Sequence, residues 1–401
     1  METEKEKPAV NTCSFCGKNK NSVKLLVTAT SVAICNECVE FCTQTIVEHE
    51  EAEINSQPKI YDPITIKNHL DEHVIGQEKA KIVLSVAIAN HYKRITHPPK
   101  NLEMQKGNVL LIGPTGSGKT LLAKTVARFL EVPFIVADAT SLTEAGYVGD
   151  DVESMISMLL SAAKNDVELA QRGIIFIDEI DKIARKGESV NISRDVSGEG
   201  VQQALLKLIE GTKCRIQPNG GRKHPSNEMI VVDTKNILFI AGGAFVGLND
   251  VIKRRTKGTS MGFNATIATI EDKSYLDEVS PDDLTKFGMI PEFVGRFATT
   301  VNVEDLNKEQ LVQVLTDIKH NFIDQYKYLF ELDGIKLSFS KDAINNIAEN
   351  CLELKTGARG LQNELERVLL LHMFNISKYK EAEIKKINIS QELVNHPNII
   401  I

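Results

Sequence analysis

Short apolar runs alternate with amphipathic segments through the middle of the chain, a pattern typical of a parallel sheet covered by helices. The segment after the first run, for example, places Leu122, Val126 and Phe129 on one face of a helix. Because the runs are almost entirely apolar, we expect each to form a buried strand. The expected strands lie near residues 109–112, 134–137, 174–177, 237–241 and 299–303.

The last quarter of the chain has a mainly helical pattern. One strand is expected at residues 335–339, after a turn made by Asp333 and Gly334. Ser340 is placed to cap the helix that follows this strand. A final amphipathic helix is expected from about 360 to 374. The C-terminal part should therefore form a smaller, mostly helical domain.

The first expected strand runs directly into a glycine-rich turn with the residues that a phosphate-binding loop requires. Glycines let the backbone wrap around phosphates, and the N–H groups of the turn and of the next helix point at them. Lys119 is placed to reach the β- and γ-phosphates, and the Thr120 hydroxyl to ligate Mg²⁺. The strand-to-helix context favours a nucleoside triphosphate site over an ordinary turn. The turn consists of Gly113, Pro114, Thr115, Gly116, Ser117, Gly118, Lys119 and Thr120.

Two adjacent acids end the third expected strand. Asp178 at the strand tip would lie beside the Mg²⁺ hydration shell, which is the Walker B role. Glu179 could polarise an attacking water as a general base. The alternative is a pair of solvated acids at the start of a helix. Next to a phosphate-binding loop, the pair favours triphosphate hydrolysis.

Four cysteines near the N-terminus have the spacing of a zinc site. Cys13 and Cys16 form one C-x-x-C pair, and Cys35 and Cys38 form a second pair after 18 intervening residues. Two disulfides are the alternative, but the expected intracellular location favours zinc. Cys42 could compete as a ligand, although its spacing suits a helix face. Because the cysteine module is small and has little hydrophobic core, the metal would supply much of its folding free energy.

The segment after the cysteine module is rich in Glu, Gln, Ser and Pro and has little apolar periodicity, so we expect a flexible linker there. The predicted organisation has four parts. They are a zinc-binding module at 1–46, a linker at 47–63, a large ATPase domain at 64–305 and a small domain at 306–401.

Composition and charge narrow the range of partners. The chain has 401 residues and a net charge of −7, so no global basic field attracts nucleic acid or anionic membranes. Its apolar runs are too short to cross a bilayer. The first residues have mixed charge and no apolar stretch of a secretory signal. We therefore expect a cytoplasmic protein with neither nucleic-acid nor membrane partners.

Several segments together resemble the ClpX family of AAA+ unfoldases, and the resemblance extends from Cys13 to the last expected helix. It implies an α/β P-loop fold, homohexameric rings with ATP between subunits, and hydrolysis that pulls polypeptide through a central pore. The segments are the four-cysteine module, the phosphate-binding loop, and residues 146–149, 290–296 and 355–361.

The resemblance also assigns residues that would contact substrate polypeptide. Tyr147 and Val148 match the pore loop, where an aromatic and a branched apolar side chain grip any sequence by van der Waals contact. Arg222, Lys223 and His224 match a basic loop at the pore entrance that attracts substrate termini. Taken alone, three basic residues would more often form a solvated surface.

Further residues match nucleotide-contacting positions of the family. Arg296 matches the arginine finger, which acts on the nucleotide of a neighbouring subunit, and Arg359 matches the sensor-2 arginine, which acts in cis. Either arginine could instead form a surface salt bridge. Val74 and Ile75 match the segment that packs on adenine. No residue is assigned as sensor 1.

A last matching segment is the loop with which the family docks on the ClpP peptidase. Its tripeptide here is Met261, Gly262 and Phe263, where the family usually has Ile-Gly-Phe or Leu-Gly-Phe. Methionine is flexible and apolar and can fill the same kind of pocket, so we expect docking. Its strength relative to the usual loop does not follow from the sequence.

The leading hypothesis is an ATP-driven unfoldase that takes tagged or adaptor-delivered proteins and feeds them to ClpP. One alternative is a nucleic-acid-remodelling AAA+ motor, which the acidic balance and a Tyr-Val grip loop disfavour. Another is an adaptor protein built on the zinc module and regulated by its ATPase. Native substrates and adaptors, and whether assembly of the hexamer needs nucleotide, do not follow from the sequence.

Overall fold

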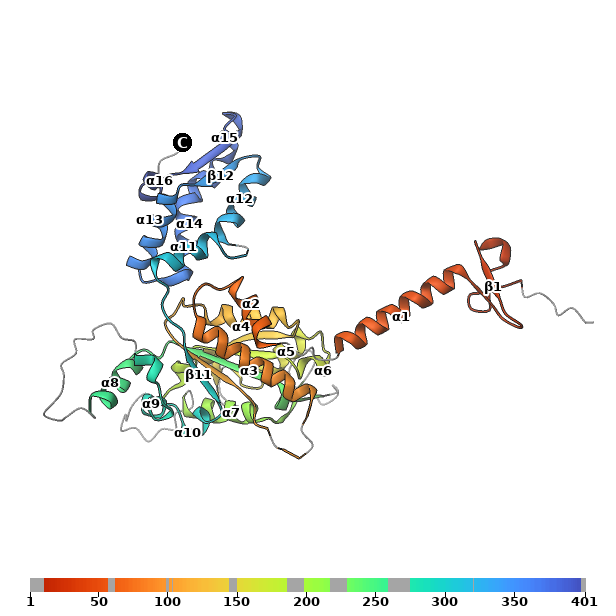
Figure 1. The fold of residues 1–401 in the computed structure, drawn as a ribbon, viewed down its shortest axis with the longest axis horizontal. Coiled ribbons are helices and arrows are strands. Elements are labelled where there is room, and N and C mark those ends of the chain that lie inside the picture. Colours follow the sequence, from red (N-terminus) through yellow and green to blue (C-terminus); the bar gives the residue numbers. More distant parts are fainter. Residues whose placement is uncertain are drawn as a thin grey trace, which may run out of the picture. The chain divides into compact units, whose positions relative to one another are not determined.

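The chain forms two compact units, Met1–Lys59 and Ile60–Ile401. In the first unit, strands β1 (Leu26–Thr28) and β2 (Ala33–Cys35) pair antiparallel, and helix α1 (Asn36–Ser56) follows directly (Figure 1). A 3₁₀ turn, η1 (Lys20–Ser22), precedes them. The computed structural model describes residues 11–56, 62–98, 101–102, 104–143, 150–185, 198–216, 229–258, 275–319 and 321–397.

Helix α1 corrects the prediction of irregular backbone at the start of the linker. The helix continues through Ser56, ten residues into the segment 47–63 that we expected to be flexible. Residues 47–56 include four glutamates and an alanine, which are strong helix formers, and extending an existing helix is easier than nucleating one. The high polarity of residues 47–56 is therefore that of a polar helix. The predicted domain boundaries stay predictions.

The second unit contains a five-stranded sheet in which all strands are parallel, as the sequence predicts (Figure 1). Each predicted strand is present within two residues of its expected bounds. In spatial order the strands are β11 (Thr299–Asn302), β3 (Val109–Ile112), β10 (Leu238–Gly243), β7 (Ile174–Asp178) and β4 (Phe134–Asp138).

Successive residues of these strands point to opposite faces, so the sheet has two hydrophobic cores. Leu111 belongs to the core that includes helices α2 (Pro63–Asp71), α3 (Glu78–Thr96) and α4 (Lys119–Phe129). Leu110 and Ile112 belong to the opposite core, with helices α5 (Ser154–Ala162) and α7 (Glu199–Glu210). Burial on both faces explains why the strands are continuous apolar runs.

The remaining elements of this large domain lie mostly at the strand ends and around its edges. Strands β5 and β6 pair parallel, and β8 and β9 pair antiparallel. The elements are η2 (Ala139–Ser141), β5 (Leu142–Thr143), β6 (Asp150–Asp151), α6 (Val167–Ala170), η3 (Ile180–Ile183), β8 (Lys213–Ile216), β9 (Ile230–Asp233), η4 (Thr234–Asn236), α8 (Leu248–Gly258), η5 (Tyr275–Glu278), α9 (Pro281–Phe287) and α10 (Pro291–Val294).

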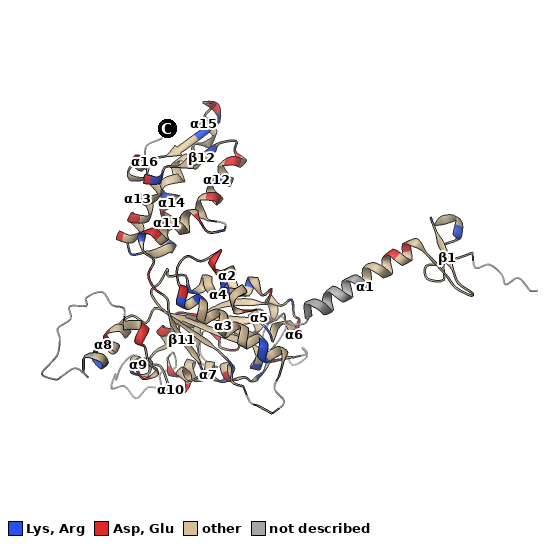
Figure 2. Ribbon diagram, viewed as in Figure 1, with Lys and Arg blue, Asp and Glu red and all other residues tan. Residues whose placement is uncertain are grey.

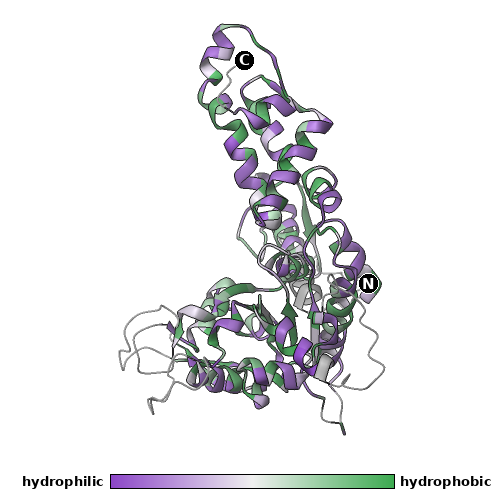
Figure 3. Cartoon of the chain, turned by 90° about the vertical axis from the view of Figure 1, so that its left-hand side faces the viewer, coloured by the Kyte–Doolittle hydropathy of each residue, from purple (hydrophilic) through white to green (hydrophobic). Residues whose placement is uncertain are grey.

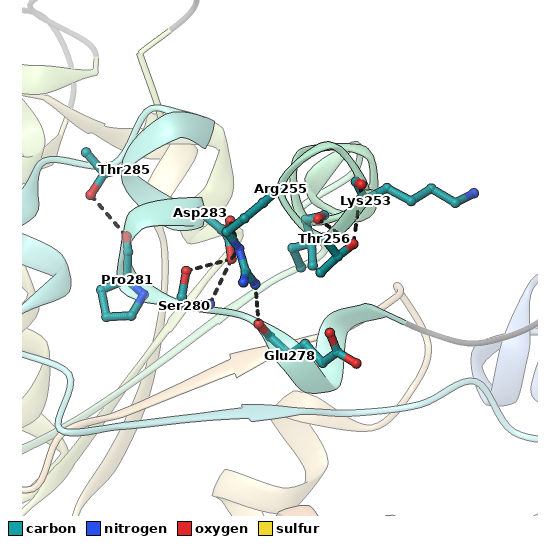
Figure 4. Close-up of polar contacts among 9 residues, drawn as sticks. Lys253, Arg255, Thr256, Glu278, Ser280, Pro281, Asp283 and Thr285 are labelled. Atoms are coloured by element: carbon teal, nitrogen blue, oxygen red, sulfur yellow. Dashed lines mark hydrogen bonds and ion pairs between the residues drawn. The ribbon is translucent and has the colours of Figure 1, made fainter. Parts of the chain in front are cut away.

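A buried ion pair joins α8 to α9 (Figure 4). Asp283 has no exposed side-chain surface, and its carboxylate accepts hydrogen bonds from Arg255 Nε at 2.9 and 3.2 Å. The same carboxylate accepts from the backbone and the hydroxyl of Ser280, which caps α9. Arg255 also donates to the carbonyl of Glu278 at 2.7 Å. These bonds fix the C-terminal part of α8 against η5 and α9.

The small domain, α11 to α16, is mostly helical as predicted, and Figure 3 shows hydrophobic and hydrophilic residues alternating along its helices. Ser340 caps α13, because its hydroxyl accepts from the backbone N–H of Ala343 at 3.1 Å. A second strand, β13, was not predicted, and it pairs parallel with the predicted strand. The elements are α11 (Lys308–Thr316), α12 (Phe322–Leu332), β12 (Lys336–Phe339), α13 (Lys341–Glu353), α14 (Gly357–Phe374), α15 (Ile376–Glu381), β13 (Lys386–Ile389) and α16 (Gln391–Asn395).

Charge is mixed over both domains. Figure 2 shows Lys and Arg interspersed with Asp and Glu along their helices. Among the described residues, no helix has both the length and the apolar character needed to cross a bilayer.

Candidate active site

The glycine-rich turn lies between β3 and α4, which is the strand-to-helix junction that the sequence predicts. Gly116 and Gly118 have φ values of +85° and +94°, a left-handed conformation that favours glycine. The Ser117 hydroxyl donates to the carbonyl of Pro114 at 2.7 Å and closes the turn. The first N–H groups of α4 lack partners within the helix, so this junction suits an anion.

Lys119 begins α4 and folds back over the turn. Its ammonium donates to the carbonyls of Gly113 at 2.7 Å and Pro114 at 2.8 Å. The residue is almost fully buried, and burial lowers the pKa of the ammonium, against the opposing effect of Asp178. A cation held this closely to the turn can exchange carbonyl partners for phosphate oxygens with little movement.

The acidic pair lies at the carboxyl end of β7, beside the turn. Thr120 Oγ1 donates to Asp178 Oδ2 at 3.0 Å. Glu179 is exposed and has a left-handed backbone, with φ of +54°, which is unusual for a residue other than glycine. Its N–H donates to Asp178 Oδ1 at 2.9 Å. Thr120 and Asp178 thus offer a hydroxyl and a carboxylate, the hard oxygen ligands that Mg²⁺ prefers.

Sequence reasoning missed a third acid at this site. Asp181 on η3 is buried and lines the same cleft, and its Oδ1 accepts from the N–H of Ala244 at 3.1 Å. A Cβ at Gly243 would lie 2.7 Å from this oxygen, so glycine permits the contact. Asp181 therefore ties the end of β10 to the segment after β7. No local sequence pattern predicts this contact, because Asp181 and Ala244 are 63 positions apart along the chain.

A cleft of about 620 Å³ brings these groups together with part of the small domain. The backbone of the phosphate-binding loop lies close to the backbone before α14. A Cβ at Gly116 would lie only 2.9 Å from the carbonyl oxygen of Thr356. Arg359, on the first turn of α14, lines the cleft, and its action on the nucleotide in cis stays a prediction. The small-domain residues that line it are Val314, Ile318, Lys319, Phe322, Ala358 and Arg359, of which only Arg359 was anticipated.

Val74 and Ile75 lie beside the cleft and are not among its lining residues. Val74 is buried in the core under α2 and α3, and Ile75 packs against the core of the small domain. Their neighbour His73 does line the cleft. The apolar part of the lining comes instead from side chains such as Val314 and Ile318. Adenine contact through Val74 and Ile75 stays a prediction.

Arg296 lies away from this cleft. It lines a separate cleft of about 660 Å³, with Lys106 and Arg94, and its guanidinium forms an ion pair with Glu210. Its backbone carbonyl accepts from Asn108 Nδ2 at 3.0 Å. Both partners of the ion pair are partly exposed. Arg296 is thus not among the lining residues of the cleft at the phosphate-binding loop, and its action on a neighbour's nucleotide stays a prediction.

Three groups of predicted contact residues lie outside the described residues, and only their flanking elements are described. Strands β5 and β6 flank the segment with Tyr147 and Val148. Strands β8 and β9 flank the segment with Arg222, Lys223 and His224, and α8 and η5 flank the one with Met261, Gly262 and Phe263.

The four N-terminal cysteines converge as predicted. Their sulfur atoms lie within 4.8 Å of one another, with Cys13 and Cys38 3.8 Å apart and Cys16 and Cys35 3.7 Å apart. A tetrahedral ion with Zn–S bonds of about 2.3 Å sets its sulfurs about 3.8 Å apart, so the site fits zinc and the distances exclude disulfides. The N–H of Cys35 donates to Cys13 Sγ at 3.3 Å.

The cysteines differ in their environment: burial raises the pKa of Cys38, whereas Cys13 favours the thiolate form. Backbone N–H groups, that of Cys16 first, lower the pKa of Cys13 to about 6, which favours the ligating thiolate. Among the described residues of this unit, the core consists of Cys13, Cys35 and Cys38, with Val23, Leu26 and Ile34 packed against them. Such a small apolar core contributes little stability by itself, and a zinc ion held by the four cysteines would supply the missing stabilisation.

A parallel sheet with a phosphate-binding loop after β3, an acidic pair after β7 and a helical domain beside the cleft defines an AAA+ ATPase. Comparison with protein families supports this class of protein. Residues 104–300 match the family described as "AAA domain (Cdc48 subfamily)", and residues 306–388 match "C-terminal, D2-small domain, of ClpB protein". The chain is therefore an ATP-binding, ATP-hydrolysing enzyme.

The N-terminal unit indicates which family of AAA+ ATPases the chain belongs to. Residues 11–48 match the family described as "ClpX C4-type zinc finger". The chain is 50% identical over 384 residues to the "ATP-dependent Clp protease ATP-binding subunit ClpX" of Treponema denticola, covering 93% of this chain and 92% of that protein. The chain belongs to the ClpX family.

Proposed function

We propose that this chain is an ATP-dependent protein unfoldase that works as a homohexamer and passes unfolded polypeptide to a ClpP-type peptidase. One observation carries the proposal: the nucleotide cleft is lined by both domains, so a change at the phosphates can move one domain against the other. The relative from Treponema denticola is named as a Clp protease subunit, which supports the peptidase partner.

Hydrolysis would use groups already in contact. Thr120 and Asp178 would hold Mg²⁺, which would neutralise charge on the phosphates. Lys119 would move from the carbonyls of Gly113 and Pro114 to the β- and γ-phosphates. Glu179, exposed beside Asp178, would take the proton of the attacking water. The N–H groups at the start of α4 would orient the phosphates.

Two arginines would act on the transition state from different subunits. Arg359 lines the cleft of its own chain and would contact the phosphates directly. Arg296 would leave its exposed ion pair with Glu210 and reach the nucleotide of the neighbouring subunit. Exposed ion pairs contribute little stability, so this exchange needs little free energy. The need for Arg296 in trans explains why such a chain would act as a ring.

Force would reach the substrate through loops anchored on the large domain. Tyr147 and Val148 would grip polypeptide, and Arg222, Lys223 and His224 would attract its acidic C-terminus. The paired strands β5 and β6, and β8 and β9, give both loops fixed ends. A loop with fixed ends transmits movement of the domain to whatever it grips.

Docking on the peptidase would use Met261, Gly262 and Phe263. Helix α8 leads into this segment, and the buried pair of Arg255 and Asp283 fixes the C-terminal part of the helix. A flexible methionine and a phenylalanine suit an apolar pocket on a partner. Substrates would arrive tagged or bound to adaptors.

The test uses a folded fluorescent reporter with an unstructured C-terminal tag. With ATP and the purified chain, reporter fluorescence should fall, and added ClpP should make the loss irreversible by degradation. ADP should support neither. Steady ATP hydrolysis without any loss of fluorescence, with or without ClpP, would overturn the unfoldase proposal. Unfolding without degradation would overturn only the peptidase partner.

A further inference from the structure

Three side chains with metal-binding atoms cluster where α2 ends. His69, Glu72 and His73 have the spacing i, i+3 and i+4, which brings them to one side of a helical turn. One ligand atom of each lies within 4.8 Å of the other two. Among the described residues, this is the one such cluster besides the four cysteines. None of the roles described above uses it as a unit.

The ring nitrogens are placed to accept a metal. His73 Nδ1 lies 3.0 Å from the carbonyl oxygen of His69, and donation to this oxygen leaves Nε2 with a free lone pair. His69 Nε2 is a buried atom for which the described residues offer no hydrogen-bond partner. His69 Nδ1 lies 4.0 Å from Glu72 Oε2. His69 therefore has one ring nitrogen, Nε2, without a hydrogen-bond partner and a second, Nδ1, facing Glu72, while His73 keeps a free lone pair on Nε2 when its Nδ1 donates.

We propose that His69, Glu72 and His73 form a binding site for a first-row transition-metal dication such as Zn²⁺, separate from the four-cysteine centre. Two imidazoles and a carboxylate form a ligand set typical of zinc, and three protein ligands leave a coordination position for water. Metal–ligand bonds of about 2.0 Å set donor atoms roughly 3.3 Å apart. The donor atoms of the cluster lie within 4.8 Å of one another, so side-chain rotations that shorten these distances by at most about 1.5 Å would bring them to that separation.

The cluster lies beside the nucleotide cleft, which gives a bound metal a consequence. Glu72 Oε2 accepts from Lys319 Nζ at 2.7 Å, and the carbonyl of Glu72 accepts from the N–H of Lys319 at 3.0 Å. His73 and Lys319 both line the cleft. A metal on Glu72 therefore competes with the ammonium of Lys319, and its binding is coupled to a contact between α2 and the small domain.

Aromatic packing is the competing explanation for the two histidines. The His69 ring stacks on Phe129 with centroids 4.5 Å apart, and it lies 4.6 Å from the His73 ring. Packing alone would keep the rings in place without using their nitrogens. It predicts no metal affinity beyond that of surface side chains, so metal titration separates the two explanations.

The experiment titrates Co²⁺ into the full-length, nucleotide-free chain whose cysteine site is already saturated with zinc. We expect one further equivalent to bind and to give the weak visible bands of nitrogen and oxygen ligation, without intense sulfur-to-cobalt charge transfer. His69→Gln and His73→Gln should each weaken this binding by about tenfold or more, since each removes a ligand. His396→Gln, at an exposed histidine of the small domain, is the matched control and should bind as wild type.

A second variant tests the competition with the ammonium. Lys319→Met should tighten Co²⁺ binding by a few fold, because it frees Glu72 and removes a nearby positive charge. Circular dichroism should show the same helical content for every variant. Binding that is equally weak in wild type and both histidine variants, or a spectrum dominated by sulfur ligation, would overturn the proposal. The readout needs no ATPase activity, so it is independent of the proposed function.

Discussion

Thr120 Oγ1 donates to Asp178 Oδ2 at 3.0 Å, although the two residues are 58 positions apart along the chain. The sheet explains this contact. Strands β3 and β7 both pair with β10, and parallel strands end at the same edge. Thr120 at the start of the helix after β3 and Asp178 at the end of β7 therefore meet without a bound ligand. Both oxygens that would hold Mg²⁺ are thus already close together.

The first prediction concerns Glu179. Glu179→Gln keeps the size of the side chain and removes its ability to take a proton, so ATP turnover should fall by about 10²–10⁴-fold while ATP binding is retained. Steady-state hydrolysis and binding of a fluorescent ATP analogue measure the two effects. Glu168→Gln, at an exposed glutamate of α6, should hydrolyse ATP as wild type. Normal turnover by Glu179→Gln would reject the role of general base.

The second prediction concerns the metal in the N-terminal unit. Removing zinc with a chelator, or replacing Cys35 with Ser, should unfold residues 11–46, because the core of this unit consists mainly of the ligands themselves. The large domain has its own cores and should retain ATP hydrolysis. Limited proteolysis would show rapid cleavage confined to the N-terminal unit. Loss of ATPase activity together with this cleavage would contradict the independence of the two units.

The third prediction concerns the ion pair of Arg255 and Asp283, which holds the C-terminal part of α8. Arg255→Met leaves the buried carboxylate of Asp283 without its cation, so the melting temperature of the large domain should fall by roughly 5 °C. Arg254→Met changes the same chemistry at an exposed neighbour and should melt as wild type. Differential scanning calorimetry measures both. If the two variants melt alike, the ion pair does not stabilise the large domain.

The parts of this structure that the sequence predicts are those with a local signal. Buried apolar runs mark all five strands of the sheet, and the phosphate-binding loop and the acids at 178 and 179 follow from their positions at strand ends. Ser340 is predicted as a cap because capping needs only a hydroxyl three residues before an N–H.

The parts that the sequence does not predict depend on contacts between distant residues. Strand β13 has four residues and pairs with β12, about 50 positions earlier, so its own pattern is too short to identify it. Asp181 was missed because its partner, Ala244, follows another strand. Val314 and Ile318 have the pattern of ordinary core positions on α11 and the turn after it, and only the folded chain places them in the cleft.

The last prediction concerns a buried carboxylate that joins three helices of the small domain. Glu364 on α14 accepts from Asn350 on α13 at 2.6 Å and from Arg367 at 2.6 and 2.8 Å, and Arg367 also donates to the carbonyl of Val394 on α16. Hydrogen bonds from Arg367 lower the pKa of Glu364 below its ordinary value of 4.5, against the opposing effect of burial.

Because the folded-state pKa lies below the unfolded value, the carboxylate stabilises the fold fully above about pH 4.5 and loses this effect as the pH falls through the folded pKa. Glu364→Gln should therefore lower the free energy of unfolding by about 2 kcal/mol at pH 7, with a difference from wild type that shrinks below about pH 4.5. Urea unfolding followed across this range measures it. Glu353→Gln, at an exposed position on α13, should show neither effect. A Glu364→Gln deficit that stays constant down to pH 3 would mean that packing, and not the charge, accounts for the loss.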